Sequence, residues 1–322
     1  MGRPTISVVT PSLNAGDYIE ELIESLEIQT FQDYEHIVVD GKSTDGTISI
    51  LKRHENRSNF KWISEPDTGI YEAVNKGLAM AKGEIQAFLP ADDLYLPWAF
   101  DLVASRFDAE KHTDVVYGDT LISRMGSKYA MVYFNPDPHG LEKLLLTYAP
   151  ATTPFFWRRR VFENLRGFDP RFRIAGDYDF VARASGKHTF SKISEVLTLW
   201  RFRPTSKTRD RRSLLRESAR VSSRIGGLRS LESPSLMYFR MLGQFLQNSY
   251  PSFWRLFLHS GGRDVHDEWA NLFKSNAISR ARLVRDLLTP LTSQYMLAQE
   301  FRSRFFPGYV DIDKLTRPGM DR

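Results

Sequence analysis

The chain has 322 residues, 42% hydrophobic and 26% charged, which suffices for one large domain or two smaller ones with a sizeable core. It has no cysteine, which excludes disulfides, thiolate zinc sites and a cysteine nucleophile, and no apolar run reaches the roughly 18 residues of a membrane span. The net charge of +5 is uneven, because residues 1–206 carry −4 and residues 207–322 carry +9. The amino terminus enters a strand pattern without a charged and apolar leader, so we expect a cytoplasmic protein.

Short apolar runs alternate with amphipathic segments along the first 110 residues. The runs are typical of buried strands and lie at 5–10, 36–40, 60–64 and 85–89. Helical spacing of apolar residues occurs at 18–29, 47–54, 70–81 and 99–107. This alternation predicts an α/β fold with a mostly parallel, Rossmann-like sheet flanked by helices. Neither G-x-G-x-x-G nor the P-loop motif occurs, so the phosphate-binding loops of those folds are not supported.

Two adjacent carboxylates, Asp92 and Asp93, follow the apolar run 85–89 and Pro90. Since proline cannot extend a central strand, both acids should stand at the carboxyl edge of the sheet, where open α/β sheets bind ligands. Neighbouring carboxylates repel each other unless a cation shares them, and oxygen ligands suit Mg²⁺ or Mn²⁺. We therefore predict a divalent metal that serves a nucleotide diphosphate; a solvated turn is the alternative.

Other polar residues follow neighbouring strands and should reach the same edge. Asp40 ends the second run, where its carboxylate can accept a hydrogen bond from a ribose hydroxyl or a base N–H. The first run ends in residues that we expect to form a turn at the donor site, namely Thr10, Pro11, Ser12 and, after Leu13, Asn14.

Three further aspartates stand near predicted helix starts. We interpret Asp17 and Asp45 as helix caps. Asp67, in the turn before helix 70–81, is either a cap or a ligand of the donor.

Four segments resemble family 2 glycosyltransferases of the GT-A fold, in the family's order and spacing: 8–30, 37–47, 64–84 and 88–93. The resemblance implies an inverting enzyme that uses a nucleotide-sugar donor, most commonly linked to UDP, with Asp40 at the base and ribose. It also implies a D-x-D-type metal site at Asp92, with Asp93 adjoining. Pro90 stands where the family usually has an acid or asparagine, so the first position of that pattern is lost and either acid could be the ligand.

The same resemblance returns at 176–177, where the family's acid-acid segment supplies the catalytic base. Gly176 replaces the first acid, so Asp177 is the candidate base, with Asp179 a supporting residue or a helix cap. At the start of helix 178–185 the helix dipole should lower the pKa of Asp177 and keep it ionised. Such a carboxylate can take a proton as the acceptor oxygen attacks.

The segment 195–206 resembles the one that closes the family's site. Arg203 and Thr205 replace the histidine and glycine often found there, so Arg201 or Arg203 could meet the donor diphosphate, with surface arginine as the default interpretation. No Q-x-x-R-W signature occurs, which argues against a processive polymer synthase.

Residues 114–119 predict another strand and residues 120–134 a hairpin. The segment 151–160 ends in three arginines, Arg158, Arg159 and Arg160. We interpret them as a solvated cationic edge, with a contact to a polyphosphate or lipid phosphate as the alternative.

We divide the chain into a glycosyltransferase domain, 1–206, and a helical basic extension, 207–322. Within the domain, 1–100 should bind the nucleotide sugar and 101–206 the acceptor, a glycan or lipid-linked saccharide. In the extension, segments 213–224, 236–247 and 277–288 read as helices. Aromatic residues with arginine at 236–246 and 252–258 are typical of a membrane interface, and equally of a helix packed on the domain or on a second copy in a homo-oligomer. We expect peripheral attachment to an anionic inner membrane face.

Two other functions fit parts of the pattern. A sugar nucleotidyltransferase normally has a Gly-rich loop with arginine and lysine, and 12–16 does not match one. A non-catalytic partner in glycan assembly is favoured if Asp92, Asp93 and Asp177 fail to converge. Nucleic-acid binding is disfavoured, because the basic residues are spread over a third of the chain without a known module.

Overall fold

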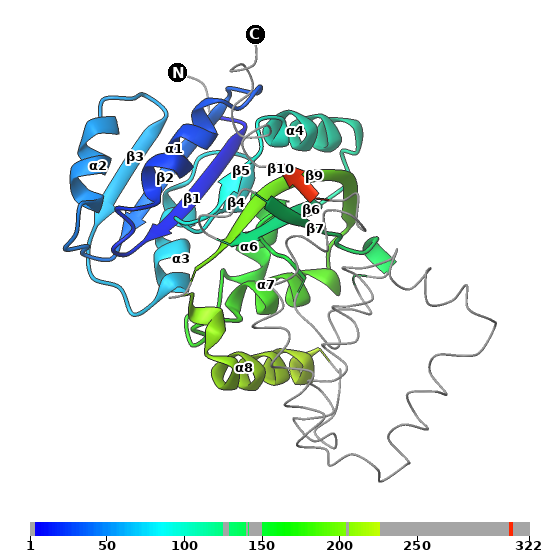
Figure 1. Ribbon diagram of the computed structural model, residues 1–322. Helices are drawn as coiled ribbons and strands as arrows, with labels where there is room; N and C mark the ends of the chain where they lie inside the picture. The colour runs from blue at the N-terminus through cyan, green and yellow to red at the C-terminus, as the bar shows by residue number, and fades with distance from the viewer. Residues whose placement is uncertain are drawn as a thin grey trace. The chain divides into compact units, whose positions relative to one another are not determined.

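A computed structural model of the protein describes residues 4–124, 129–139, 141, 150–203, 206–225 and 309–311 (Figure 1). The chain divides into a large unit, Met1–Asn248 with Asp311–Arg322, and a smaller unit, Ser249–Val310. The predicted helices at 236–247 and 277–288 lie outside the described residues. Among the helices that are described, none is long and apolar enough to cross a bilayer.

The first part of the chain forms the predicted alternation of strands and helices. Its elements are β1 (Ile6–Ser12), α1 (Ile19–Glu27), β2 (Tyr34–Asp40), α2 (Thr47–His54), β3 (Phe60–Ser64), α3 (Ile70–Met80) and β4 (Ile85–Phe88). These bounds confirm the predicted elements to within about two residues. The turn predicted at 11–14 begins later, because β1 stays paired with β2 as far as Ser12 opposite Asp40.

Two of the cap predictions have different outcomes. The cap at Asp17 is wrong, since α1 begins after Tyr18, which makes no side-chain capping bond. Asp45 does satisfy a free amide at the start of α2, because its carboxylate accepts the N–H of Thr47 at 3.0 Å.

The second part adds antiparallel strands and further helices. Its elements are β5 (Leu94–Tyr95), α4 (Ala99–Ala109), β6 (Val115–Arg124), β7 (Tyr129–Tyr133), β8 (Phe155–Arg158), α6 (Arg159–Leu165), α7 (Gly176–Ser185), β9 (Phe190–Phe202), a 3₁₀ turn η1 (Lys207–Arg209) and α8 (Arg211–Arg224). Antiparallel pairing of β6 with β7 confirms the predicted hairpin. The long strand β9 was not predicted. The last described element is β10 (Tyr309–Asp311).

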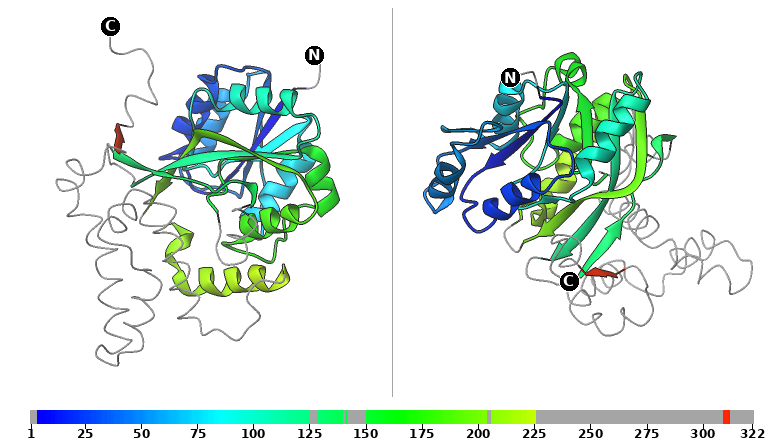
Figure 2. Two further views of the ribbon diagram at one scale, coloured as in Figure 1. Left: turned by 90° about the vertical axis from the view of Figure 1, so that its right-hand side faces the viewer. Right: turned by 90° about the horizontal axis from the view of Figure 1, so that it is seen from above.

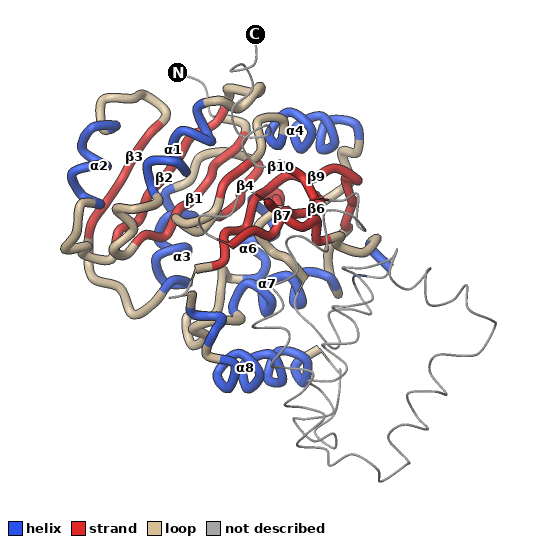
Figure 3. Tube along the Cα trace, viewed as in Figure 1, coloured by secondary structure: helices blue, strands red, loops and turns tan. Residues whose placement is uncertain are grey.

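The strands of the large unit form one sheet in the order β7-β6-β8-β4-β1-β2-β3 (Figure 3). β4, β1, β2 and β3 are parallel, which confirms the predicted Rossmann-like half. β8 is antiparallel to both of its neighbours, and β9 joins β6 to β5. The result is a mixed, open α/β sheet with helices on both faces, seen from two further sides in Figure 2.

The helix α3 lies close against β1 and β2 because it carries a glycine at the crossing. A Cβ atom on Gly77 would come within 2.4 Å of Val9 and 3.1 Å of Val39. The same face of the sheet holds an aromatic cluster with α6 and α7, in which Phe168 stacks on Phe180 at 4.1 Å between ring centroids. Each fully buried ring of this kind contributes about 1.5–3 kcal/mol to folding. This packing fixes where α3 and α7 begin.

The three arginines of 158–160 differ in their exposure to solvent. Arg158 is buried and donates to the backbone carbonyls of Thr113 and Phe107 at 2.9 and 3.1 Å. Arg159 donates to the carbonyls of Ala81 and Gly83. A third, Arg160, pairs with the carboxylate of Asp114 at 2.6 Å. These cations tie the start of α6 to the neighbouring loops, so the solvated-edge interpretation was wrong for Arg158 and Arg159, whereas about half of the Arg160 side chain is exposed.

Candidate active site

The ends of β1, β2 and β3 meet at one edge of the sheet, where Asp40 pairs in register with Ser12 on one side and Ser64 on the other. Asp40 is fully buried, and its carboxylate accepts the Ser43 N–H at 2.9 Å and the Ser64 hydroxyl at 2.7 Å. The Ser43 hydroxyl donates to its other oxygen. A carboxylate has about four acceptor sites. Described residues occupy three of them, and the side chain itself is not exposed to solvent.

The residues of β1 that were predicted to bind the donor point in different directions. Thr10 is fully buried, and its hydroxyl lies 2.9 Å from Nε2 of the buried His36, so it serves the core. Pro11 lies within β1 itself. The Ser12 hydroxyl is buried and has no hydrogen-bond partner in the part of the chain that is described.

The loop after β1 is joined to the loop after β2. Asn14 has a left-handed backbone with φ of +50°, and its side-chain oxygen accepts the N–H of Thr44 at 2.9 Å. Asp67 lies beside the same loop, since a Cβ atom on Gly41 would come within 2.6 Å of its carboxylate. Burial raises the pKa of Asp67 above its ordinary value. Both residues therefore border the edge of the sheet that Asp40 occupies, and Thr10 does not.

Asp92 and Asp93 take opposite directions after a turn closed by the Asp93 N–H and the Pro90 carbonyl at 3.0 Å. Asp92 is partly exposed, and its carboxylate accepts from Nε of Arg203 at 2.6 Å. Asp93 is only 2% exposed and accepts the backbone N–H of Arg201 at 2.9 Å. Burial, together with the charge of Asp92, raises the pKa of Asp93 well above its ordinary value.

The two arginines at the end of β9 hold this turn in place. Nε of Arg201 donates to the backbone carbonyl of Asp92 at 2.5 Å, and its NH1 pairs with Glu21 of α1. Arg203 pairs with the Asp92 carboxylate and lies over the ring of Tyr18 at 4.8 Å. Of the two, only Arg203 presents its charge to the Asp92 side chain, so it is the better placed to meet a diphosphate.

A divalent metal fits this edge through Asp92 alone. Mg²⁺ and similar ions are commonly held by one or two carboxylates together with substrate phosphates and water. Asp92 offers one such carboxylate, with an oxygen that Arg203 does not engage, whereas Asp93 is turned inward. Within the described residues, no three acids or histidines cluster as a complete metal site. The donor's own phosphates would therefore have to complete the coordination.

Asp177 stands in the first turn of α7, as predicted, and three groups donate to its carboxylate. They are the Thr152 hydroxyl at 2.5 Å, the Tyr71 hydroxyl at 3.1 Å and the N–H of Tyr178 at 2.8 Å. Asp177 is partly buried, and this burial raises the pKa of its carboxyl group in spite of the donors. The expected direction of the pKa shift was therefore wrong, because burial outweighs the hydrogen bonds that favour the ionised form.

Two routes of contact join Asp177 to the sheet edge. Tyr71 belongs to the first turn of α3, directly after the loop that contains Asp67. On the other side, Thr152 precedes Thr153, whose hydroxyl lies 3.1 Å from that of Thr198 in β9. That strand continues to Arg201 and Arg203, which hold Asp92. These contacts link Asp177 to the first turn of α3 and, through Thr152 and Thr153, to β9, whose end holds Asp92.

Sequence reasoning did not identify two of the groups that hold Asp177. Tyr71 was assigned to the packing face of α3, where it is indeed only 3% exposed. Helical spacing cannot show that its hydroxyl reaches a residue 106 positions away. Thr152 precedes a strand in a segment without periodicity, so no local signal marked it.

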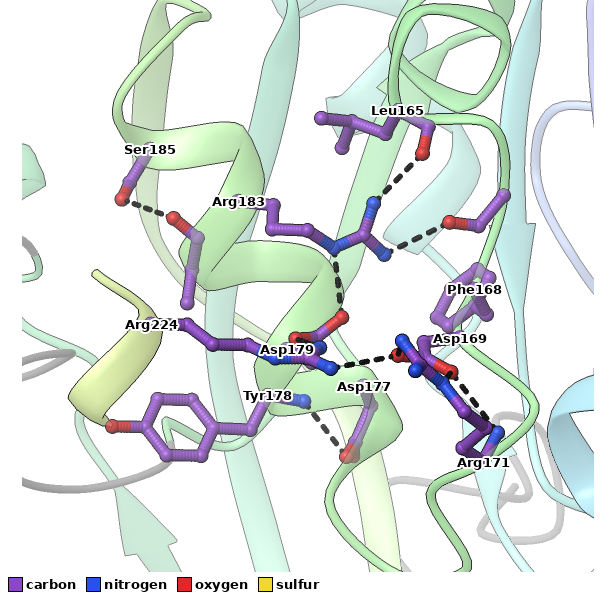
Figure 4. Close-up of polar contacts among 12 residues, drawn as sticks. Leu165, Phe168, Asp169, Arg171, Asp177, Tyr178, Asp179, Arg183, Ser185 and Arg224 are labelled. Carbon is purple, nitrogen blue, oxygen red and sulfur yellow. Dashed lines mark hydrogen bonds and ion pairs between the residues drawn. The ribbon is translucent and has the colours of Figure 1, made fainter. Parts of the chain in front are cut away.

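Asp179 is not a site residue. It is 1% exposed and pairs with Arg183 of α7 and Arg224 of α8, both at 2.7 Å (Figure 4). A separate cavity of about 320 Å³ lies at the start of β6, lined in part by His112, His188 and Phe190. β6 is parallel to β4, so this cavity opens at the end of the sheet opposite Asp92.

The sequence profile of glycosyl transferase family 2 matches residues 7–166. A glycosyltransferase of PGL/p-HBAD biosynthesis from Mycobacterium tuberculosis is 30% identical over 186 residues, which cover 57% of this chain and 70% of that protein. The chain therefore belongs to glycosyl transferase family 2. Family membership makes it an enzyme and removes both alternatives, the sugar nucleotidyltransferase and the non-catalytic partner.

Solved structures show the same fold at low identity. The structure of S. aureus TarS 1-349 in complex with UDP is 21% identical, with a TM-score of 0.56, and the match covers 82% of this chain and 78% of that one. The mannosyltransferase PcManGT from Pyrobaculum calidifontis, solved with GDP-Man and Mn²⁺, is 17% identical with a TM-score of 0.55, and the match covers 95% and 88%. The fold is thus that of these GT-A glycosyltransferases.

Proposed function

We propose that this enzyme moves a sugar from a nucleotide-sugar donor, UDP-linked as in the family's commonest case, to a hydroxyl of a glycan or lipid-linked acceptor. The observation that carries the proposal is the carboxylate of Asp177. It is oriented by Thr152 and Tyr71, and these contacts link it to α3 and to β9, whose end holds Asp92. The structures of TarS with UDP and PcManGT with GDP-Man support a donor of this class.

The reaction is a single displacement. Asp177 accepts the proton of the acceptor hydroxyl as its oxygen attacks the anomeric carbon. The bond from that carbon to the diphosphate oxygen breaks, and the configuration inverts. Because burial raises the pKa of Asp177, its carboxylate is a stronger base than an exposed aspartate.

Donor binding falls to the residues at the strand ends. Asp40 accepts from the ribose or base, and Ser12, Asn14 and Asp67 border the same loop. Asp92 would hold a Mn²⁺ or Mg²⁺ ion against the donor diphosphate. That ion would neutralise the charge that develops on the leaving group. Arg203 adds a positive charge beside the same carboxylate.

We extend the proposal to the setting of the enzyme on the basis of charge. Residues 207–322 carry +9, which favours attachment to an anionic membrane surface on the cytoplasmic side. The aromatic segments 236–246 and 252–258, from which membrane contact or a homo-oligomer was predicted, lie outside the described residues. Liposome co-sedimentation with and without anionic lipid tests the attachment.

The test of the catalytic role is Asp177→Asn, assayed by release of the nucleoside diphosphate across a panel of nucleotide sugars with Mn²⁺. Loss of a general base lowers kcat by roughly 100- to 10,000-fold. Donor binding, measured as the thermal shift with UDP, should stay unchanged. Asp108→Asn, at an exposed position of α4, is the control. Turnover of Asp177→Asn at the normal rate would show that another group is the base.

A further inference from the structure

The segment that carries Asp177 is held from one side by α8, which follows the predicted domain boundary at 206. Glu217 of α8 accepts three consecutive backbone N–H groups, those of Arg173 at 3.0 Å, Ile174 at 2.9 Å and Ala175 at 2.9 Å. These residues come directly before α7, which begins at Gly176. Hydrogen bonds to an ionised acceptor are about twice as strong as neutral ones. One side chain therefore fixes the entry to the base-bearing helix.

A second residue of α8 holds the same segment further along. Arg224 donates to Asp179 at 2.7 Å and to Asp169 at 3.0 Å, and both contacts belong to the polar network drawn in Figure 4. The pKa of Asp169 is held well below its ordinary value by Arg171 and Arg224, so it is ionised. Arg224 also lies over the ring of Phe172 at 5.0 Å. Helix α8 thus contacts residues 169–179 at several points.

Ile174 connects these contacts of α8 to Asp177. Ile174 donates its N–H to Glu217, and its carbonyl accepts the Tyr71 hydroxyl at 2.7 Å. The same hydroxyl lies 3.1 Å from Asp177. A shift of Ile174 would therefore move the hydroxyl and alter the direction of the Asp177 carboxylate.

We propose that Glu217 is a positioning residue for the catalytic base and that α8 is a working part of the catalytic domain. This inference rests on the proposed role of Asp177. Among the described residues, Glu217 reaches the base through the backbone of residues 173–175, which leads into α7, and through Ile174 to Tyr71. None of its hydrogen bonds there involves a donor-site residue. Its loss should therefore slow the chemical step and leave donor binding intact.

The experiment compares Glu217→Ala and Glu217→Gln with the wild-type enzyme in the same diphosphate-release assay. A misplacement of about 1 Å at a reacting group can cost on the order of 100-fold in rate. We expect kcat to fall roughly 10- to 100-fold for Glu217→Ala, with the donor KM and the UDP-induced thermal shift unchanged. Glu217→Gln keeps one acceptor oxygen, so its kcat should lie between those of Glu217→Ala and the wild-type enzyme. It also keeps the test informative if the alanine variant does not fold.

Arg216→Gln is the matched control, since Arg216 is an exposed neighbour on α8. A folded Glu217 variant with wild-type kcat overturns the inference. So does one that loses donor binding together with turnover, because Glu217 would then only support the fold. Asp177→Asn is measured in parallel. If that variant stays active, the proposed base is wrong, whereas an inactive Asp177→Asn beside a fully active Glu217→Ala removes only the role of Glu217.

Discussion

Gly176 is the position where this chain lacks the acid of the family pattern, and the structure explains why. A Cβ atom on Gly176 would lie 2.6 Å from two ring carbons of Tyr71 and 2.8 Å from a third. Tyr71 cannot easily yield, because its ring stacks on Phe168 and its hydroxyl is bonded to Ile174 and Asp177. We therefore predict that Gly176→Ala displaces the Tyr71 hydroxyl from the base.

The size of the effect of Gly176→Ala follows from the steric overlap of the added Cβ atom with the Tyr71 ring. Ordinary contact is 3.4–4 Å, so the ring must move by about 1 Å, and overpacking of a filled core costs about 1–3 kcal/mol. Alanine regains up to about 1 kcal/mol through its better helix propensity. The net loss of folding stability should be about 0–3 kcal/mol. We also expect kcat to fall at least 10-fold, because the displaced hydroxyl orients the proposed base.

The assay pairs urea unfolding with steady-state kinetics of donor turnover. Gly186→Ala is the control, because Gly186 ends the same helix in a right-handed conformation and no atom lies within 4 Å of its added Cβ. It should be neutral or slightly stabilising and fully active. If Gly176→Ala were as active as Gly186→Ala, Tyr71 would not be needed at the position in which the structure places it.

Two further predictions concern the adjacent acids. Asp93→Asn should be at least as stable as wild type at pH 7, because the folded state disfavours the ionised carboxylate and asparagine can still accept the Arg201 N–H. A raised pKa in the folded state gives stability that is present below the unfolded pKa of about 3.9 and is lost as the pH rises. The advantage of asparagine should therefore vanish in urea titrations near pH 4, and a variant that is clearly weaker at pH 7 would contradict the assignment. Asp92→Asn should lose the Mn²⁺-dependent part of the UDP thermal shift and lower kcat/KM about 100-fold, and chelation of the metal should have the same effect on the wild type. Asp101→Asn on α4 is its control, and an Asp92 variant with unchanged Mn²⁺ dependence would place the metal elsewhere.

The fold of the first 110 residues could be predicted because each element carries a local signal. Apolar runs and helical spacing gave the strands and helices from β1 to β4, and α4, nearly at their observed ends, whereas β5 was not predicted. The sequence after α4 carries weaker local signals of secondary structure. β9 reads as an irregular mixture of exposed and buried positions, because it pairs with β6 across a bulge and with β5 further on.

The surroundings of the candidate base could not be predicted, because they depend on contacts between distant segments. Three residues orient Asp177 or the loop before it. Thr152 precedes β8, Tyr71 belongs to α3 and Glu217 belongs to α8. Each stands in its own element as an ordinary packing or surface residue. Only the fold shows that they meet around residues 173–177.

The side chains of Asp92 and Asp93 point in opposite directions because of the backbone that carries them, and not because of their chemistry. Successive side chains of an extended strand point to opposite faces, and Asp93 immediately precedes the extended residues of β5. With Asp93 directed inward to the N–H of Arg201, its neighbour in the turn is left on the open side with Arg203. Two adjacent acids at this edge therefore cannot both serve one ion. Asp93 holds the end of β9, and the proposed metal role therefore falls to Asp92.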